Sequence, residues 1–452
     1  MNIIVAGCGK IGESIISNLV TEELNITAID TDTNVINDIT NIYDIIGVHG
    51  NAADCETLTE AGVEKAELFV AVTNSDELNM LSCFMAKKMG AKHTIARIRN
   101  PQYNDKSIGF MRQQLGLSMS INPELFAARE LFSILKLPSA AKIEYFSRSH
   151  FEMIELKIKE PSALIGLKLS DLNSFCNAKV LICLVRRDEE AYIPDGNFVL
   201  QSGDRIHITA TSTEMAKFLK KAGLLQKQAK NVMILGGSMT AIYLAKMLCN
   251  AGVSVKIIEN DRERCREICE LIPKAVVING DGAAQELLLE EGLNTVDAFV
   301  SLTGIDEENI LMSLFASSQN VPKVISKVNR NELAIMAENL GLDCIVSPKS
   351  ATADILIRYA RALKNSVDSS VETLYKLADG KAEALEFIVK QDFKFISKPL
   401  KELKLKKNTL IAGIIRGRKT IIPSGDDSIE LDDRIIVLAG NQRLQNLSDI
   451  IE

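Results

Sequence analysis

Residues 3–12 read IIVAGCGKIG, and this short stretch decides the fold. Four apolar residues, typical of a buried parallel strand, lead into a turn with glycines at positions 7, 9 and 12. A strand, glycine turn and helix of this kind hold a pyrophosphate against the backbone and the helix N-terminus. The pattern is specific when an acidic residue ends the next strand, and Asp30 lies there, 23 positions after Gly7.

We therefore predict a first adenine-nucleotide site at the carboxyl edge of a parallel sheet. Asp30 would accept hydrogen bonds from the ribose hydroxyls, and no arginine follows it to hold a 2′-phosphate, so NAD(H) is favoured over NADP(H). Two alternatives stay open, namely a turn that binds nothing, and structural roles for Thr73 as a helix cap and Arg97 as a solvated base. The predicted residues are Gly7, Cys8, Gly9, Lys10, Ile11, Gly12, Asp30, Asn51, Ala52, Thr73, Asn74 and Arg97.

The chain repeats itself, with second-half motifs about 229 positions after their first-half counterparts. VMILGGSMTA (232–241) answers the opening stretch, and GDGAAQELLLEEG (280–292) answers GNAADCETLTEAG (50–62). SINPE (120–124) is answered by IVSPK (345–349). The whole molecule is therefore interpreted as a tandem duplication.

The second copy departs from the glycine pattern. Ser238 and Ala241 stand where the first copy has Gly9 and Gly12, and a side chain at position 238 lies where a pyrophosphate would approach. A second nucleotide site and a purely structural copy both remain open. The residues of the second site would be Gly236, Gly237, Ser238, Met239, Thr240, Glu259, Asp281, Thr303, Gly304 and Lys327.

Each copy divides into a strand–helix part and a smaller turn-rich part. Alternating strands and helices predict a doubly wound, Rossmann-like parallel sheet, with strands near 3–6, 26–29, 44–48, 67–72 and 93–98 in the first copy. The smaller part has an alternating strand at 151–158 and a buried strand at 180–187, which together predict an α+β, β-rich domain. Polar segments near 211–230 and 364–381 are candidate connectors. The predicted domains are residues 1–135, 140–225, 230–362 and 370–452.

The composition of the chain argues against several classes of function. A net charge of −7 disfavours nucleic-acid binding and docking on anionic lipid. No apolar run approaches the roughly 20 residues that span a bilayer, and no signal peptide precedes the first strand. Nine scattered cysteines are expected to be reduced thiols in a cytoplasm, and no metal site is expected, because Cys265 and Cys269 lack partner ligands nearby.

A nucleotide can be a reactant or a signal. An NAD-dependent oxidoreductase built on a duplicated Rossmann fold is the alternative, but it would need a proton donor beside the nicotinamide. The four histidines, none of which has a counterpart in the other half, favour structural roles: His49, His93, His150 and His207. We therefore expect no catalytic residues and no enzyme.

The whole chain resembles the Trk-type potassium-uptake regulatory subunits, which are tandems of RCK domains, each with a TrkA-N and a TrkA-C half. The resemblance rests on GCGKIG, AIDTD, the stretch from HGNAADC to NMLSC, and ARIRNP, with GLKLSDL, IPDG and SGDRI in the small domain. It implies a cytoplasmic protein that binds NAD(H), or else ATP or ADP, and gates a separate membrane-embedded potassium transporter subunit of the TrkH type.

The resemblance also implies assembly and location. A ring of eight RCK domains would need four chains of two domains each, a homo-tetramer, with a dimer as the isolated form. Such a ring would be peripheral at the inner face of the membrane, held there by its partner and not by insertion. Because the two copies differ at Gly9 and Ser238, we expect the first half to sense ligand and the second to serve mainly as scaffold.

Overall fold

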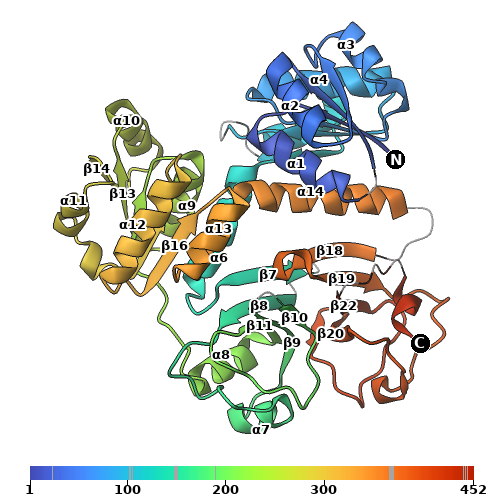
Figure 1. The fold of residues 1–452 in the computed structure, drawn as a ribbon, viewed down its shortest axis with the longest axis vertical. Coiled ribbons are helices and arrows are strands. Elements are labelled where there is room, and N and C mark those ends of the chain that lie inside the picture. The colour runs from blue at the N-terminus through green and yellow to red at the C-terminus, as the bar shows by residue number, and fades with distance from the viewer. Residues whose placement is uncertain are drawn as a thin grey trace.

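The computed structural model describes residues 1–22, 24–100, 103, 105–146, 151–188, 190–365, 371–440, 442, 444 and 446–452. These residues form two six-stranded parallel sheets and two five-stranded antiparallel sheets. Figure 1 shows the two parallel sheets on different sides of the long helix α14 and the two antiparallel sheets side by side beneath it. The predicted fold class, two Rossmann-like halves each with a small β-rich domain, is confirmed.

The first parallel sheet has the strand order β3-β2-β1-β4-β5-β6. All five predicted strands are present, and the short sixth strand, Met119–Ile121 (β6), was not predicted. The strands are Asn2–Ala6 (β1), Asn25–Asp30 (β2), Ile46–His49 (β3), Leu68–Ala71 (β4), His93–Arg97 (β5) and β6. The helices are Lys10–Val20 (α1), Thr33–Ile42 (α2), Cys55–Glu60 (α3), Asp76–Met89 (α4), Asp105–Leu115 (α5) and Pro123–Lys136 (α6).

The second parallel sheet repeats this order as β14-β13-β12-β15-β16-β17, which agrees with the duplication seen in the sequence. Its strands are Asn231–Leu235 (β12), Ser254–Glu259 (β13), Val276–Asn279 (β14), Ala298–Ser301 (β15), Lys323–Lys327 (β16) and Ile345–Val346 (β17). Its helices are Met239–Asn250 (α9), Arg262–Leu271 (α10), Gln285–Glu290 (α11), Asp306–Ser318 (α12), Asn331–Asn339 (α13) and Pro348–Asn365 (α14).

The small domains are the two antiparallel sheets, ordered β10-β9-β11-β8-β7 and β18-β19-β22-β20-β21. The first contains Lys142–Phe146 (β7), Phe151–Lys157 (β8), Leu172–Cys176 (α7), Val180–Arg187 (β9), Glu190–Tyr192 (β10), Arg205–Ala210 (β11) and Ser212–Lys221 (α8). The second contains Val371–Leu377 (β18), Ala382–Ile388 (β19), Thr409–Arg416 (β20), Lys419–Ile421 (β21) and Arg434–Gly440 (β22).

Both predicted connectors contain secondary structure, so that prediction was wrong in part. The segment 211–230 includes α8, whose Phe218 and Leu219 are fully buried in the first small domain. The segment 364–381 includes the edge strand β18; its residues 366–370, like His150, lie outside the described residues. The limits of the four predicted domains stay predictions.

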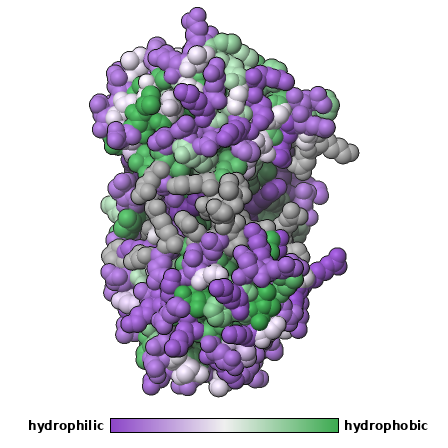
Figure 2. Space-filling view, turned by 90° about the vertical axis from the view of Figure 1, so that its right-hand side faces the viewer, coloured by the Kyte–Doolittle hydropathy of each residue, from purple (hydrophilic) through white to green (hydrophobic). Residues whose placement is uncertain are grey.

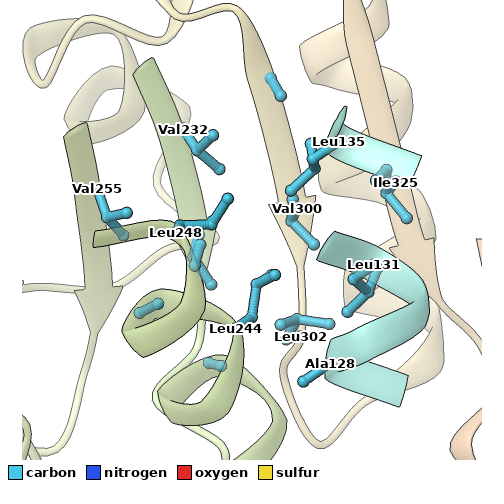
Figure 3. Close-up of a cluster of buried hydrophobic side chains, with 14 of the residues drawn as sticks. Ala128, Leu131, Leu135, Val232, Leu244, Leu248, Val255, Val300, Leu302 and Ile325 are labelled. Carbon is cyan, nitrogen blue, oxygen red and sulfur yellow. The ribbon is translucent and has the colours of Figure 1, made fainter. Parts of the chain in front are cut away.

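The two halves exchange helices. Helix α6 of the first half packs on α9 and the sheet of the second half, and Figure 3 shows Ala128, Leu131 and Leu135 facing the second half's apolar side chains. Helix α14 of the second half packs along α1 of the first, burying Leu356 and Ile357. Each Rossmann-like core is therefore completed by the other half of the same chain.

An ion-pair cluster fixes the far end of the α1–α14 contact. Arg361 of α14 donates two hydrogen bonds of 2.7 Å to the two carboxylate oxygens of Glu22, and it also contacts Glu383 at 3.0 Å. Bidentate contacts of this kind fix geometry as well as charge. Because Glu22 follows the end of α1 and Arg361 lies near the end of α14, the two helices run in the same direction.

The two small domains pack face to face through a close approach at Gly413 in β20. A Cβ on Gly413 would lie 2.1 Å from a ring carbon of Phe151, and Phe151 packs edge-on against Phe146 with ring centroids 5.9 Å apart. Both rings are fully buried in an apolar cluster shared by the two sheets. The contact therefore leaves no space for a side chain at position 413.

Replacing Gly413 with alanine is expected to destabilise the protein by about 1–3 kcal/mol, because overpacking a filled core forces the rings to move. The measurement is thermal unfolding, with a lower transition temperature expected. Gly109→Ala is the matched control, because a Cβ there meets nothing within 4 Å. An unchanged transition for Gly413→Ala would contradict the tight packing of Phe151 against position 413.

The surface is mostly polar on the face shown in Figure 2, where hydrophobic residues form smaller areas between hydrophilic ones. Within the described part of the chain, no helix is long and apolar enough to cross a membrane.

Candidate nucleotide site

The first glycine turn is built for close approach. Gly7 has φ of 90°, and a Cβ there would lie 2.7 Å from the backbone nitrogen of Thr73. A Cβ on Gly12 would lie 1.9 Å from the carbonyl oxygen of Gly7. Gly9 differs from both, because its φ is −63° and a Cβ there would meet nothing within 4 Å. Gly9 therefore leaves open the space outside the turn, where a phosphate would approach.

Asp30 holds the turn from the adjacent strand end. Its Oδ2 accepts a hydrogen bond of 2.6 Å from the backbone N–H of Cys8, and its Oδ1 accepts one of 3.0 Å from that of Asp32. Burial raises the pKa of the Cys8 thiol to about 12, with a further contribution from Asp30, so the thiol stays neutral. The predicted acid therefore lies against the glycine turn, at the edge where a ribose would be recognised.

A buried asparagine fixes the ends of the fourth and fifth strands. Asn79 of α4 is fully buried; its side-chain oxygen accepts hydrogen bonds from the backbone N–H (2.8 Å) and the hydroxyl (2.7 Å) of Thr73. Its amide nitrogen donates to the carbonyl of Arg97 at 3.0 Å. Ser75, not Thr73, caps α4. Sequence reasoning missed Asn79, although an asparagine recurs at the matching position 309.

Arg97 is buried and paired, so its reading as a solvated base was wrong. Its guanidinium donates to Glu124 of α6 at 2.7 Å, and both side chains are largely removed from solvent. Burial lowers the pKa of Arg97, an effect that the negative charge of Glu124 opposes. The charge at this strand end is therefore already neutralised before any phosphate arrives.

The other predicted residues of the first site surround this edge. Lys10 is exposed and Ile11 half-buried at the start of α1. Asn51 follows β3, and its side chain accepts a hydrogen bond from the N–H of Ala53 at 3.0 Å, with Ala52 buried beneath. Asn74 is exposed beside Thr73. All twelve residues lie at the carboxyl edge of the parallel sheet, as predicted.

The second glycine turn repeats the first one in geometry. Gly236 has φ of 92°, and the N–H of Gly237 donates to Glu259 at 2.6 Å, matching the contact between Cys8 and Asp30. Ser238 keeps the extended backbone of Gly9, but its hydroxyl oxygen accepts from the N–H of Ala241 at 3.4 Å. Helix α9 therefore has a side-chain cap, whereas α1 has none.

A cavity of about 520 Å³ lies beside the second turn. Its walls include Gly236–Ser238, Glu259, Thr303, Gly304 and Arg264. Arg264 of α10, which sequence reasoning missed, donates to the carbonyl of Gly237 at 2.8 Å and so lies across the turn. Its first-half counterpart is Val35, so the first turn has no equivalent contact from this position.

The remaining predicted residues of the second half also gather at this edge. Thr303 is held by the fully buried Asn309 at 2.9 Å, as Thr73 is held by Asn79. Asp281 follows β14 and accepts from the N–H of Ala283 at 2.9 Å. Met239 and Thr240 begin α9. The second half therefore contains a complete, although altered, copy of the site.

The two halves differ in charge at the fifth strand. Lys327 occupies the place of Arg97, and its ammonium donates to the carbonyl of Leu302 at 3.3 Å. Lys349 occupies the place of Glu124, so a second cation replaces the carboxylate. Burial lowers the pKa of both lysines, and the exposed Lys10 lowers them further. The two halves therefore differ in charge at this strand end, and the carboxylates of Asp306 and Glu124 lie close enough to Lys327 to oppose the lowering of its pKa.

This architecture defines a class. A tandem of Rossmann-like halves, each with a glycine turn, a strand-end acid and a small β-rich domain, is that of an RCK-type protein. The TrkA-N domain matches residues 3–123 and 232–348, and the TrkA-C domain matches residues 153–223 and 384–452. The chain belongs to the TrkA family of Trk system potassium uptake proteins.

Relatives and solved structures agree with this membership. The Trk system potassium uptake protein TrkA homolog of Archaeoglobus fulgidus is 33% identical over 100% of both chains. The GsuK RCK domain has a TM-score of 0.64 at 16% identity, covering 97% of this chain and 92% of that chain. The GsuK channel bound to NAD has a TM-score of 0.63 at 15% identity, covering 97% and 77%. The expectation that the chain is not an enzyme is confirmed by these relatives.

Proposed function

We propose that this protein is the nucleotide-sensing regulatory subunit of a Trk-type potassium transport system. The observation that carries the proposal is the pair of glycine turns, each held by a strand-end carboxylate through a 2.6 Å hydrogen bond. Such a turn offers free N–H groups and a helix N-terminus to a pyrophosphate. The ligands are NAD(H), or ATP and ADP, bound by the residues predicted for the two sites.

The partner is a separate membrane-embedded potassium-translocating subunit of the TrkH type. Membership in the family of potassium uptake proteins supports this part of the proposal. The protein then works in the cytoplasm, peripheral to the membrane and held there by its partner. A ligand at the sheet edge can shift the partner's gating only through its different affinity for the open and closed states.

Four chains assemble into a ring of eight RCK domains. Support comes from large apolar side chains of α12 and α13 that are more than half exposed in the single chain: Leu311, Ile335 and Met336. Apolar side chains gathered on neighbouring helices are typical of a protein–protein contact. A contact between different surfaces of successive chains closes into a ring when the rotation allows it.

The test is potassium flux through proteoliposomes that contain the membrane subunit together with the purified protein. Adding NADH, NAD, ATP and ADP in turn is expected to change the flux, and at least two of them should act in opposite directions. Liposomes with the membrane subunit alone are the control and should not respond. A flux that no nucleotide changes in the complete system would contradict the proposal.

The purified protein is also expected not to consume NADH at an enzymatic rate, which would be about 1–1000 per second. Of the histidines that the structure describes, His207 lies buried in β11, 3.5 Å from Glu155, and His49 at the end of β3 has its Nε2 3.0 Å from the backbone carbonyl of Thr31. Absorbance of NADH, followed with a panel of carbonyl substrates, is the measurement. Saturable consumption would restore the oxidoreductase alternative.

A further inference from the structure

The hydroxyl of Tyr243 joins the second half of the chain to the first. Tyr243 lies on α9, the helix that begins at the second glycine turn, and its hydroxyl donates to the carbonyl of Arg99 at 2.7 Å. The same oxygen accepts from the side-chain amide of Asn122 at 3.1 Å. Arg99 and Asn122 belong to the first half, and Asn122 caps α6. The hydroxyl therefore crosses the boundary between the halves.

Arg99, whose carbonyl accepts the hydrogen bond from Tyr243, lies at the edge of the first site. The guanidinium of Arg99 donates to the carbonyl of Asn74 and contacts Asp76 at 3.5 Å. The buried carboxylate of Asp76 also accepts from the N–H groups of Arg99 and Asn100, both at 2.8 Å. Arg99 therefore fastens the loop after β5 to the loop after β4, where Thr73 and Asn74 lie.

We propose that Tyr243 is a positioning residue for the first nucleotide site, supplied by the second half. It holds Arg99, and through Arg99 it sets the place of Asn74 at the sheet edge. Because Tyr243 lies near the start of α9, five residues after Ser238, a displacement of α9 at the second site reaches the first site through this hydroxyl. The inference rests on the proposed function, since it concerns the same nucleotide sites.

Two further observations support the assignment. Burial raises the pKa of Tyr243, so the hydroxyl keeps the proton that it donates. The link is also one-sided, because the matching position in α1 is Ser14. Among the described residues, the hydroxyl of Ser14 makes no hydrogen bond to the second half. The duplication therefore did not place this contact twice, which agrees with unequal roles for the two sites.

The test compares Tyr243→Phe with Tyr359→Phe. The hydroxyl of Tyr359 also joins the halves, through His93 at 3.3 Å, but His93 begins β5 at the opposite edge of the sheet. Both variants are made with Glu259→Ala, which disables the second site, and NADH binding is followed by its fluorescence. Tyr243→Phe is expected to weaken binding about twofold to tenfold, as the loss of one hydrogen bond would. Tyr359→Phe should leave it unchanged.

A second readout separates positioning from a merely structural role. Amide hydrogen exchange of residues 239–250 is measured with and without NADH in the Glu259→Ala protein. NADH at the first site is expected to slow this exchange, and adding Tyr243→Phe should remove the effect, because coupling between sites is reciprocal. If Tyr243→Phe changes neither the affinity for NADH nor the effect of NADH on exchange in residues 239–250, this inference is wrong while the proposed function stands. Failure of NADH, ATP and ADP to bind even the unmodified protein would overturn the proposed function with it.

Discussion

Replacing Asp30 with alanine is expected to weaken NAD(H) binding at the first site by about 1.5–3 kcal/mol, roughly 10- to 150-fold. The ribose would lose charge-assisted hydrogen bonds to the carboxylate. The N–H of Cys8, which now donates to Asp30 at 2.6 Å, would also lose its partner. Titration calorimetry measures the loss directly.

The matched control is Glu259→Ala, which removes the equivalent carboxylate from the second turn and should leave the first site's affinity nearly unchanged. NADPH gives a second check, because its 2′-phosphate would meet the negative charge of Asp30. NADPH should therefore bind the unmodified protein more weakly than NADH, and Asp30→Ala should narrow that difference. Equal affinities for the two in the unmodified protein would contradict the role given to Asp30.

The parts of the fold that repeat with a short period could be predicted from the sequence. The central parallel strands, such as β1 and β4, are buried apolar runs, and α1 shows its buried face at Ile15, Ile16 and Leu19. The glycine turn and Asp30 are likewise local features, since positive φ at Gly7 and the crowding at Gly12 restrict which residues can stand there. Because the chain is duplicated, each of these sequence patterns occurs twice, and the second occurrence supports the first.

Contacts between elements that are far apart in the sequence could not be predicted in this way. The apolar face of α6 is the same whether it covers its own sheet or the other half's, so nothing local reveals the exchange of α6 and α14. Helix α8 was taken for a connector because a polar sequence surrounds its few buried residues, of which Phe218 is the largest. Packing against the first small domain, which the sequence does not show, makes this segment helical.

The candidate site shows the same limit. Arg97 could be placed at a strand end, but its partner Glu124 lies on a helix 27 positions later and no spacing rule connects them. Asn79 and Asn309 were predictable in principle, because the same polar residue recurs at the matching position of the two helices α4 and α12. A repeated buried polar residue requires hydrogen-bond partners, and here the partners are strand ends of the site.

The structure makes the comparison between Gly9 and Ser238 a direct test of which half senses the ligand. Gly9 has an ordinary φ and room for a Cβ, so Gly9→Ser is expected to fold and to cap α1 as Ser238 caps α9. The added hydroxyl would then occupy an N–H group of the first turn and project into the space for the pyrophosphate. Any lost response in this variant therefore reports on the ligand, and an unchanged thermal transition would verify the fold.

Gly9→Ser is expected to abolish the response of potassium flux to NADH in the reconstituted complex, whereas Ser238→Gly should change it much less. The expected coupling free energy between nucleotide binding and the channel is about 1–3 kcal/mol, which corresponds to a 5- to 150-fold shift in the apparent nucleotide affinity. The charge difference at the fifth strand, where Lys349 replaces Glu124, points to unequal halves independently of the glycine turn. If Ser238→Gly instead altered the response more than Gly9→Ser, the second half would be the sensor and the first its scaffold.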